Sequence, residues 1–199
     1  MQLLSSGASP FVRKCRVVLL ETGQDDIEIR DVTANPMGGD ATVNAANPTG
    51  KIPALIRDDG PAIYDSRVIC RFLDQKAGSG LYPESRLWDV LSLEANSDAI
   101  MEAAIAITYE RRLRPEALWW PDWFEAQWAK IDRSLDALEA RSMPLLEGPL
   151  NMGQIAVGCA LGYIDFRHGD RSWRDGHGAL AAWEARFSAR DSMQATKPG

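Results

Sequence analysis

The first candidate for a chemical role in this 199-residue sequence is a serine at the start of an expected helix. Ser9 precedes Pro10, and proline favours the first position of a helix. A serine in that place caps the helix by accepting a hydrogen bond from an orphan backbone N–H. That cap is one interpretation of Ser9. The other is that its hydroxyl and the free amides of the helix N-terminus stabilise an anion such as a thiolate, which would lower the pKa of a thiol below its usual ~8.5.

A proline at the start of an expected strand is the second candidate. Pro53 lies within residues 47–55, where a central strand of a small sheet should begin. Proline cannot donate to a strand ladder, so an ordinary strand start or bulge is one interpretation. The other is a cis Ile52–Pro53 bond, which would turn the backbone of Ile52 toward a cleft, free to pair with an extended ligand.

An acidic residue and a serine stand side by side at the third candidate, Asp65-Ser66. One interpretation is a plain helix cap. The other is a site for a zwitterion, in which Ser66 and the helix-end amides hold a carboxylate. Asp65 would then accept a hydrogen bond from a nearby ammonium group. The α-carbon of an amino acid carries both of these groups.

The first 80 residues alternate short strands with helices, which predicts an α/β domain. Asp59-Gly60 between two apolar runs predicts a hairpin of two antiparallel strands. We expect strands at residues 2–4, 27–32, 52–56 and 62–64, helices at 10–22 and after Asp65, and a loop with one short irregular helix at 35–50.

The remaining residues have helical periodicity only. Asn151 and Gln154 form the pattern of a capping box at the start of an apolar helix. A linker rich in small residues separates the two patterns, so we expect an α/β domain at 1–77, a linker at 78–86 and an all-helical domain at 87–199. Its further helices are expected at residues 87–112, 123–141 and 179–189.

Composition and charge exclude several classes of protein. The net charge is −6, which disfavours nucleic-acid binding, and most of it belongs to the helical half. The cysteines, Cys15, Cys70 and Cys159, are odd in number and far apart, which excludes a disulfide scaffold. With His168 and His177 as the histidines, no metal-ligand cluster is expected. The sequence has no apolar run of about 20 residues and no signal-peptide pattern, so we expect a cytoplasmic protein without membrane contact.

Taken in order, these motifs resemble those of the glutathione S-transferase family, in particular serine-type, bacterial-like cytosolic members. The resemblance covers the whole chain and rests on Ser9-Pro10-Phe11 with Arg16, on residues 47–55, on Asp65-Ser66 and on the helical second half. It implies a thioredoxin-like α/β domain followed by an all-α domain. It also implies glutathione as co-substrate, with no metal or other cofactor, and a homodimer.

The resemblance assigns the catalytic role to Ser9, whose side chain would face the glutathione sulfur and activate the thiolate. Ser5 and Ser6 are rival hydroxyls in the same turn. Serine forms no mixed disulfide, so redox chemistry is disfavoured. Cys15 lies nearly two turns into the helix, where a core residue is expected and not a nucleophile.

The resemblance also assigns the glutathione-binding residues. Pro53 matches the family's cis-proline, and the backbone of Ile52 would pair with the cysteinyl unit. Asp65 and Ser66 match the acidic-Ser pair that holds the γ-glutamyl end. Lys51 would add a positive charge for a glutathione carboxylate.

The second substrate is expected between the two halves, around the Arg114-Pro115 break. Its candidate residues are Tyr109, Arg112, Trp119 and Trp120. The other tryptophans are expected to pack in the helical core: Trp88, Trp123, Trp128, Trp173 and Trp183.

The sequence therefore predicts a glutathione transferase that directs the thiol of glutathione at an electrophilic small molecule, as in detoxification. One alternative is a glutathione-dependent peroxidase, disulfide reductase or isomerase that uses the same thiolate. A second is a non-catalytic binding module that keeps the fold, since retention of a ligand site does not prove turnover.

Overall fold

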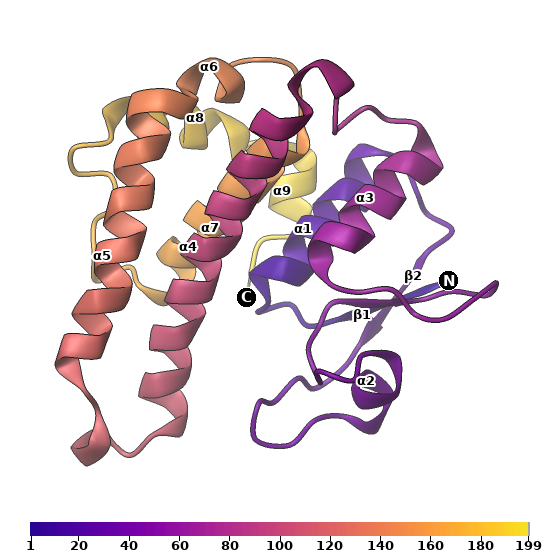
Figure 1. Cartoon of the computed structure of the whole chain (residues 1–199), viewed down its shortest axis with the longest axis horizontal. Coiled ribbons are helices and arrows are strands. Elements are labelled where there is room, and N and C mark those ends of the chain that lie inside the picture. The colour runs from indigo at the N-terminus through magenta and orange to yellow at the C-terminus, as the bar shows by residue number, and fades with distance from the viewer. Residues whose placement is uncertain (199) are drawn as a thin grey trace. The chain divides into compact units, whose positions relative to one another are not determined.

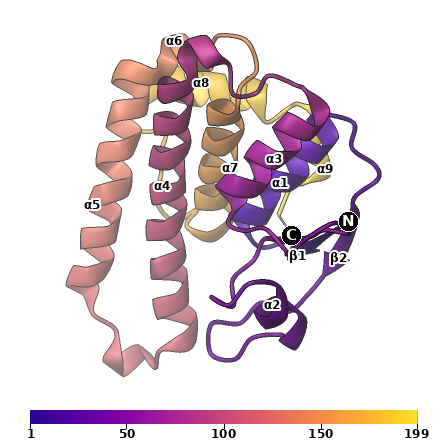
Figure 2. The same ribbon diagram turned by 45° about the vertical axis from the view of Figure 1, so that its right-hand side comes forward.

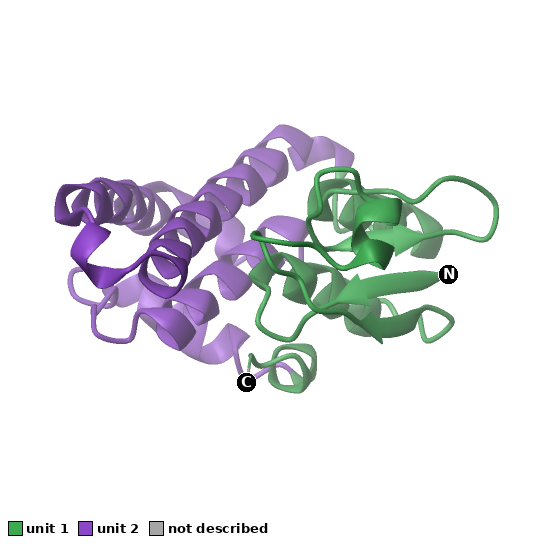
Figure 3. Cartoon of the chain, turned by 90° about the horizontal axis from the view of Figure 1, so that it is seen from below, with its two compact units in different colours: residues 1–83, 191–199 green, residues 84–190 purple. Residues whose placement is uncertain are grey.

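The computed structural model of the chain describes residues 1–198 and divides them into two units (Figure 3). Residues 1–83 and 191–198 form the first unit, and residues 84–190 form the second. The linker expected at 78–86 ends in a single 3-10 turn, η1 (Glu84–Arg86). Among residues 1–198, no helix combines the length and the apolar character that a bilayer crossing requires.

A three-stranded sheet forms the centre of the first unit. Strand β1 (Gln2–Ser5) lies between β2 (Glu28–Asp31), which is parallel to it, and β3 (Ala54–Ile56), which is antiparallel. Successive side chains of a strand point to opposite faces. Leu3 and Leu4 are both fully buried, so both faces of the sheet are covered.

Helices provide that cover. Helices α1 (Pro10–Glu21) and α3 (Ser66–Ala77) pack against each other and lie side by side in Figures 1 and 2. The short helix α2 (Ala41–Ala46) packs on β3 through a small apolar cluster of Leu4, Val43 and Ala54.

The last helix, α9 (Asp191–Ala195), was not expected from the sequence and packs against α1. The Arg13 guanidinium of α1 donates to the Met193 carbonyl at 3.0 Å, and the Ser192 hydroxyl donates to the Glu21 carboxylate. These contacts explain why residues 191–198 group with the first unit.

The expected strand at 62–64 is wrong in extent. Only Ile63 pairs with β3, by two backbone hydrogen bonds to Leu55 of 2.9 and 3.0 Å. Pro61 before it has no N–H, and its carbonyl accepts the Arg57 Nε at 3.0 Å. After it, Asp65 already caps α3, so the pairing has no room to extend.

The second unit is entirely helical, as predicted, so the chain has a thioredoxin-like α/β unit and an all-α unit. The long helix α4 (Leu87–Leu113) packs against α5 (Pro121–Ala137) and α7 (Met152–Arg167). Gly153 lets α4 and α7 approach closely, because a Cβ there would lie 2.7 Å from a Leu93 methyl carbon.

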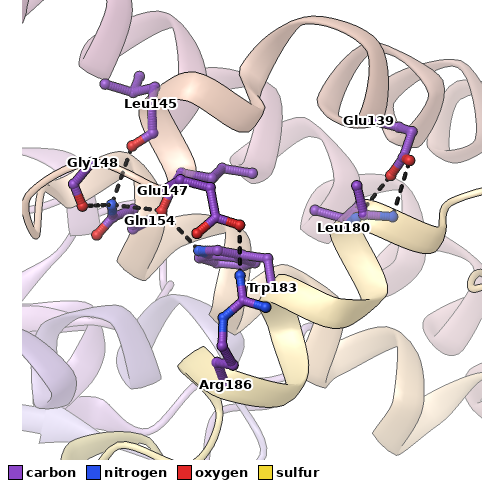
Figure 4. Close-up of polar contacts among 10 residues, drawn as sticks. Glu139, Leu145, Glu147, Gly148, Gln154, Leu180, Trp183 and Arg186 are labelled. Carbon is purple, nitrogen blue, oxygen red and sulfur yellow. Dashed lines mark hydrogen bonds and ion pairs between the residues drawn. The ribbon is translucent and has the colours of Figure 1, made fainter.

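The helix expected at 123–141 is present, but it changes from α-helical to π-helical form near its end. Helix α5 stops at Ala137 and continues as a π-helical segment, η3 (Leu138–Ser142), and then as α6 (Met143–Leu146). Glu139 of η3 accepts the backbone N–H groups of the first turn of α8 (Gly178–Phe187), which has no cap of its own (Figure 4).

The capping box of α7 is confirmed. Asn151 Oδ1 accepts the Gln154 N–H at 3.2 Å, and Gln154 Oε1 accepts the Asn151 N–H at 3.3 Å. The Gln154 Nε2 also donates to carbonyls of the preceding loop, so this side chain ties the loop to the helix (Figure 4). Its carbonyl partners are those of Leu145, Leu146, Gly148 and Pro149.

Two of the five tryptophans expected in the helical core are exposed. Trp128, Trp173 and Trp183 are buried as predicted, but Trp88 is 77% exposed and Trp123 is 40% exposed. The buried positions of α4 begin at residues 90 and 93, and residue 88 lies about 200° around the helix from residue 90. Helical phase therefore turns Trp88 to solvent.

Candidate functional site

The register of the sheet brings the first two candidate motifs to one end of the first unit. Leu4 of β1 pairs with Ala54 of β3, and the two strands are antiparallel. The chain therefore enters β3 beside the point where it leaves β1. Ile52 and Pro53, which precede β3, lie next to the turn that leads to Ser9.

The third motif reaches the same end through the bridge after β3. Leu55 pairs with Ile63 in antiparallel fashion, so the residues after Ile63 run back toward the start of β3. Asp65 and Ser66, at the N-terminus of α3, follow two and three positions later. The positive ends of the α1 and α3 dipoles thus converge at one end of the sheet, an arrangement that favours a negatively charged ligand.

Ser9 caps α1 and leaves its own proton available. Its Oγ accepts the Val12 N–H at 3.3 Å, and its backbone N–H donates to the Ser6 carbonyl at 3.0 Å. The side chain of Ser9 is half-buried. Because the hydroxyl acts only as an acceptor in the cap, it can still donate to a ligand atom.

The rival hydroxyls occupy different environments. Ser5 is fully buried at the end of β1, and its Oγ has no hydrogen-bond partner among the described residues. Ser6 lies in the turn and is half-buried. Of the three serines, Ser9 is the one at the helix N-terminus.

The backbone of Ile52 is an unpaired edge. The Ile52–Pro53 peptide bond is cis. The side chain of Ile52 packs against the cluster of Leu4, Val43 and Ala54. Within residues 1–198, its backbone N–H and carbonyl form no hydrogen bond. Such a backbone edge can pair with an extended peptide.

Asp65 is the N-cap of α3 and carries a negative charge at neutral pH. Its Oδ1 accepts the Arg67 N–H at 3.0 Å, and its Oδ2 lies 3.0 Å from the Arg67 guanidinium. Burial opposes ionisation, but the hydrogen bonds and the charge of Arg67 outweigh it and hold the pKa of Asp65 below its ordinary value. Two carboxylate oxygens offer about four acceptor positions, so capacity remains for an ammonium group.

Two other residues assigned to glutathione, Ser66 and Lys51, differ in their exposure to solvent. Ser66 is buried, and its hydroxyl forms no hydrogen bond among residues 1–198. Lys51 is exposed, and within the described chain its ammonium group pairs with no acidic side chain. The sequence analysis did not identify Arg67 as the ion-pair partner of Asp65. The signal for it was a positive charge two residues after an N-cap aspartate.

Cys15 is a core residue, as expected. Its Sγ lies 3.8 Å from the Cys70 Sγ and 3.9 Å from the Ser66 carbonyl oxygen, and both thiols are fully buried. A thiol without solvent access cannot reach an incoming electrophile.

The structure places the four candidates for the second substrate at one end of the second unit, where α4 ends, a 3-10 turn η2 (Glu116–Leu118) follows and α5 begins. Tyr109, Arg112 and Trp120 are exposed. Trp119 is half-buried; its Nε1 donates to the Arg114 carbonyl at 3.1 Å, and its ring meets Phe124 edge-on.

With the fold and these residues in place, comparison with known proteins establishes the family. Residues 3–81 match the family model of the glutathione S-transferase N-terminal domain, and residues 121–186 match that of the C-terminal domain. The chain belongs to the glutathione S-transferase family.

Individual relatives agree with that assignment. The uncharacterized GST-like protein YibF of Escherichia coli K12 is 32% identical over 100% of this chain and 98% of its own. A glutathione transferase family member from Pseudomonas fluorescens Pf-5, solved with bound glutathione, is 44% identical over 100% of this chain and 98% of that chain, with a TM-score of 0.96. A structure from the same organism with bound S-(propanoic acid)-glutathione is 42% identical over 100% of both chains, with a TM-score of 0.91.

Proposed function

We propose that this protein is a glutathione transferase that ionises the thiol of glutathione beside Ser9 and directs it at an electrophilic carbon of a small molecule. The observation that carries the proposal is the convergence, at one end of the sheet, of two helix N-termini and an unpaired backbone edge at Ile52. Glutathione is an extended, anionic peptide with an amino acid α-carbon at one end, and it matches all three features.

Each part of glutathione has a partner in this arrangement. Asp65 accepts a hydrogen bond from the γ-glutamyl ammonium group, and Ser66 with the first amides of α3 binds the α-carboxylate. The backbone of Ile52 pairs with the cysteinyl unit. Lys51 contributes charge for a glutathione carboxylate.

The sulfur of glutathione then lies at the N-terminus of α1. The Ser9 hydroxyl donates to it, and the helix N-terminus stabilises the thiolate, so the pKa of the bound thiol falls. The thiol proton leaves to solvent. The thiolate forms a carbon–sulfur bond as the leaving group departs with its electron pair, and proximity of the two bound reactants supplies much of the rate.

The relatives solved with ligands support the same chemistry. One holds glutathione, and the other holds a glutathione whose sulfur carries a propanoic acid group. Carried over to this chain, the second ligand indicates a site that accepts a substituted sulfur. We assign the second substrate to Tyr109, Arg112, Trp119 and Trp120. We also propose a cytoplasmic homodimer that acts in detoxification.

Calorimetric titration with glutathione, paired with ultraviolet detection of the bound thiolate, tests the proposal. The unaltered protein should bind glutathione and show thiolate absorbance at neutral pH, and Ser9→Ala should bind glutathione with the absorbance lost. If neither protein binds glutathione, transferase and reductase functions both fail. Binding without thiolate in the unaltered protein would favour a non-catalytic module.

A further inference from the structure

Two cysteines of the first unit meet in its core, between α1 and α3 (Figures 1 and 2). The Cys15 Sγ lies 3.8 Å from the Cys70 Sγ, and both side chains are fully buried. The two residues belong to different helices, so the packing of α1 against α3 brings them together. The proposed transferase chemistry uses neither thiol.

The two sulfurs are close enough to become bonded after a small movement. A disulfide has an S–S length of about 2.05 Å, so the Cys15 and Cys70 sulfurs would have to approach by about 1.8 Å. Each sulfur moves by rotation about one bond, between staggered positions. Part of the approach therefore has to come from a shift of α1 relative to α3, within a close-packed core.

This pair of thiols lies directly behind the N-terminus of α3. The Cys15 Sγ is also 3.9 Å from the carbonyl oxygen of Ser66, the first residue of α3. Cys70 follows Ser66 by four residues, which is one helical turn. Ser66 and Asp65 are the residues proposed to bind the γ-glutamyl end of glutathione. A shift of α3 at Cys70 therefore acts on the proposed glutathione site from one turn away.

We propose that hydrogen peroxide converts Cys15 and Cys70 into a disulfide, and that this bond weakens the binding of glutathione. The second part rests on the proposed transferase function, because it needs the glutathione site. One thiol loses its proton, and its sulfur attacks a peroxide oxygen, which leaves a sulfenic acid and releases hydroxide. The hydroxide takes up the proton. The other thiol then attacks the sulfenic sulfur, the S–S bond forms and water leaves, so two thiols are oxidised and one peroxide is reduced to two waters.

Burial controls the rate of this oxidation. In the closed structure neither thiol is exposed, so peroxide reacts with molecules in which the contact between α1 and α3 has opened locally. The reaction is therefore slower than that of an exposed thiol. Once one cysteine is a sulfenic acid, the other sulfur is already its neighbour when the helices close, which favours the disulfide over further oxidation.

Mass spectrometry of the folded full chain after peroxide treatment tests the disulfide. The chain should lose two hydrogen atoms, a peptide pair linked through Cys15 and Cys70 should appear, and the thiols titrated in denaturant should fall from three to one. Cys159→Ala should form the same link, because Cys159 lies in the second unit. Oxygen added to Cys15 or Cys70 without a link, or a link to Cys159, would overturn the proposal.

Calorimetry with S-methylglutathione tests the effect of the disulfide on the site. This analogue has no thiol, so it cannot reduce the bond. The oxidised chain should bind it about fivefold more weakly than the reduced chain, and a phosphine reductant should restore the affinity. Cys15→Ala treated with peroxide in the same way should keep its affinity, because it cannot form the link. Loss of affinity in this variant would assign the effect to other oxidised side chains and overturn the coupling.

The two measurements distinguish this proposal from the transferase function. Equal affinity of the linked and reduced chains would overturn the coupling between the disulfide and the glutathione site. If no link forms but the analogue binds, the disulfide is wrong and the transferase proposal stands. If the link forms but neither glutathione nor the analogue binds the reduced chain, the transferase proposal and the coupling fail, and the disulfide stands.

Discussion

The candidate sites of the two units consist of different kinds of chemical group. The first uses helix N-termini and an unpaired strand edge, which are backbone groups, together with the side chains at the capping positions. The second uses exposed side chains at the end of α4 and the start of α5. Backbone groups cannot be exchanged by substitution, so the first arrangement suits one constant ligand. Surface side chains are exchanged freely, so the second suits a substrate that varies between relatives.

The two units also differ in what holds them together. The first packs helices on the two faces of a small sheet. In the second, polar side chains tie loops and helix ends to the rest of the unit. The buried Gln154 side chain holds the loop before α7, and the half-buried Glu139 side chain accepts the first backbone N–H groups of α8. All seven tryptophans lie in the second unit, so their fluorescence reports its unfolding separately from the first.

The largest effect is expected for Gln154→Ala. The substitution removes the side-chain half of the capping box and the hydrogen bonds from this side chain to the carbonyls of Leu145, Leu146 and Gly148. We expect the free energy of unfolding of the second unit to fall by about 2 to 4 kcal/mol. Urea unfolding followed by tryptophan fluorescence measures it.

Glu147→Ala is the matched control, because Glu147 and Arg186 form an exposed ion pair beside the same loop (Figure 4). It should cost less than about 0.5 kcal/mol. If Gln154→Ala and Glu147→Ala lowered the free energy of unfolding equally, the buried Gln154 side chain would contribute no more to the stability of the second unit than an exposed ion pair.

The next largest effect concerns glutathione binding to the first unit. Asp65→Ala removes the charge proposed to bind an ammonium group, and we expect glutathione to bind about tenfold more weakly by calorimetry. Asp65→Asn keeps an N-cap acceptor but loses the charge, so it should restore the helix and not the affinity.

Lys51→Ala should weaken glutathione binding by less than about threefold, since an exposed lysine offers only a screened charge. A larger loss from Lys51→Ala than from Asp65→Ala would reverse the assignment of the γ-glutamyl end.

A third prediction distinguishes the role of Cys15, within α1, from that of Ser9, its N-cap. Cys15→Ala removes a fully buried sulfur, so the free energy of unfolding should fall by about 1 kcal/mol, as measured by urea unfolding of the whole chain followed by circular dichroism. The thiolate absorbance of bound glutathione should persist in this variant and be lost in Ser9→Ala. Loss of the thiolate in Cys15→Ala would show that the core thiol influences the reacting sulfur.

The sequence predicted those features of the fold that local chemistry determines. Proline, serine and aspartate set the N-termini of α1 and α3, and Asn151 with Gln154 set that of α7. Features that depend on distant contacts were missed. The strand expected at 62–64 is limited to one bridge, α9 is held by Arg13, and the exposure of Trp88 follows from which face of α4 the other helices cover.

In the candidate site, too, the residues determined by local chemistry could be predicted, and the features that depend on distant contacts could not. Ser9, Pro53 and Asp65 were found from their types and their order, because each occupies a position where the backbone needs that residue. The backbone of Ile52 was not recognised as unpaired from the sequence alone, because that property depends on which groups find no partner within residues 1–198 of the folded chain.

The smallest expected effect is a pH dependence confined to the second unit, which holds both histidines. His168 is buried, and its Nε2 donates to the Ala104 carbonyl at 2.9 Å. Burial lowers the pKa of His168, so the unfolded chain binds this proton more readily than the folded one. The resulting stabilisation is complete above the unfolded pKa of about 6.5 and is lost progressively as the pH falls below it.

The free energy of unfolding measured by tryptophan fluorescence should therefore decrease between pH 7.5 and pH 5.5, over the range in which an unfolded histidine (pKa of about 6.5) gains its proton. His168→Gln keeps a donor for the Ala104 carbonyl and removes the titration, so its free energy of unfolding should change less over this range. An equal decrease in His168→Gln would assign the pH dependence to other groups and remove this difference between the units.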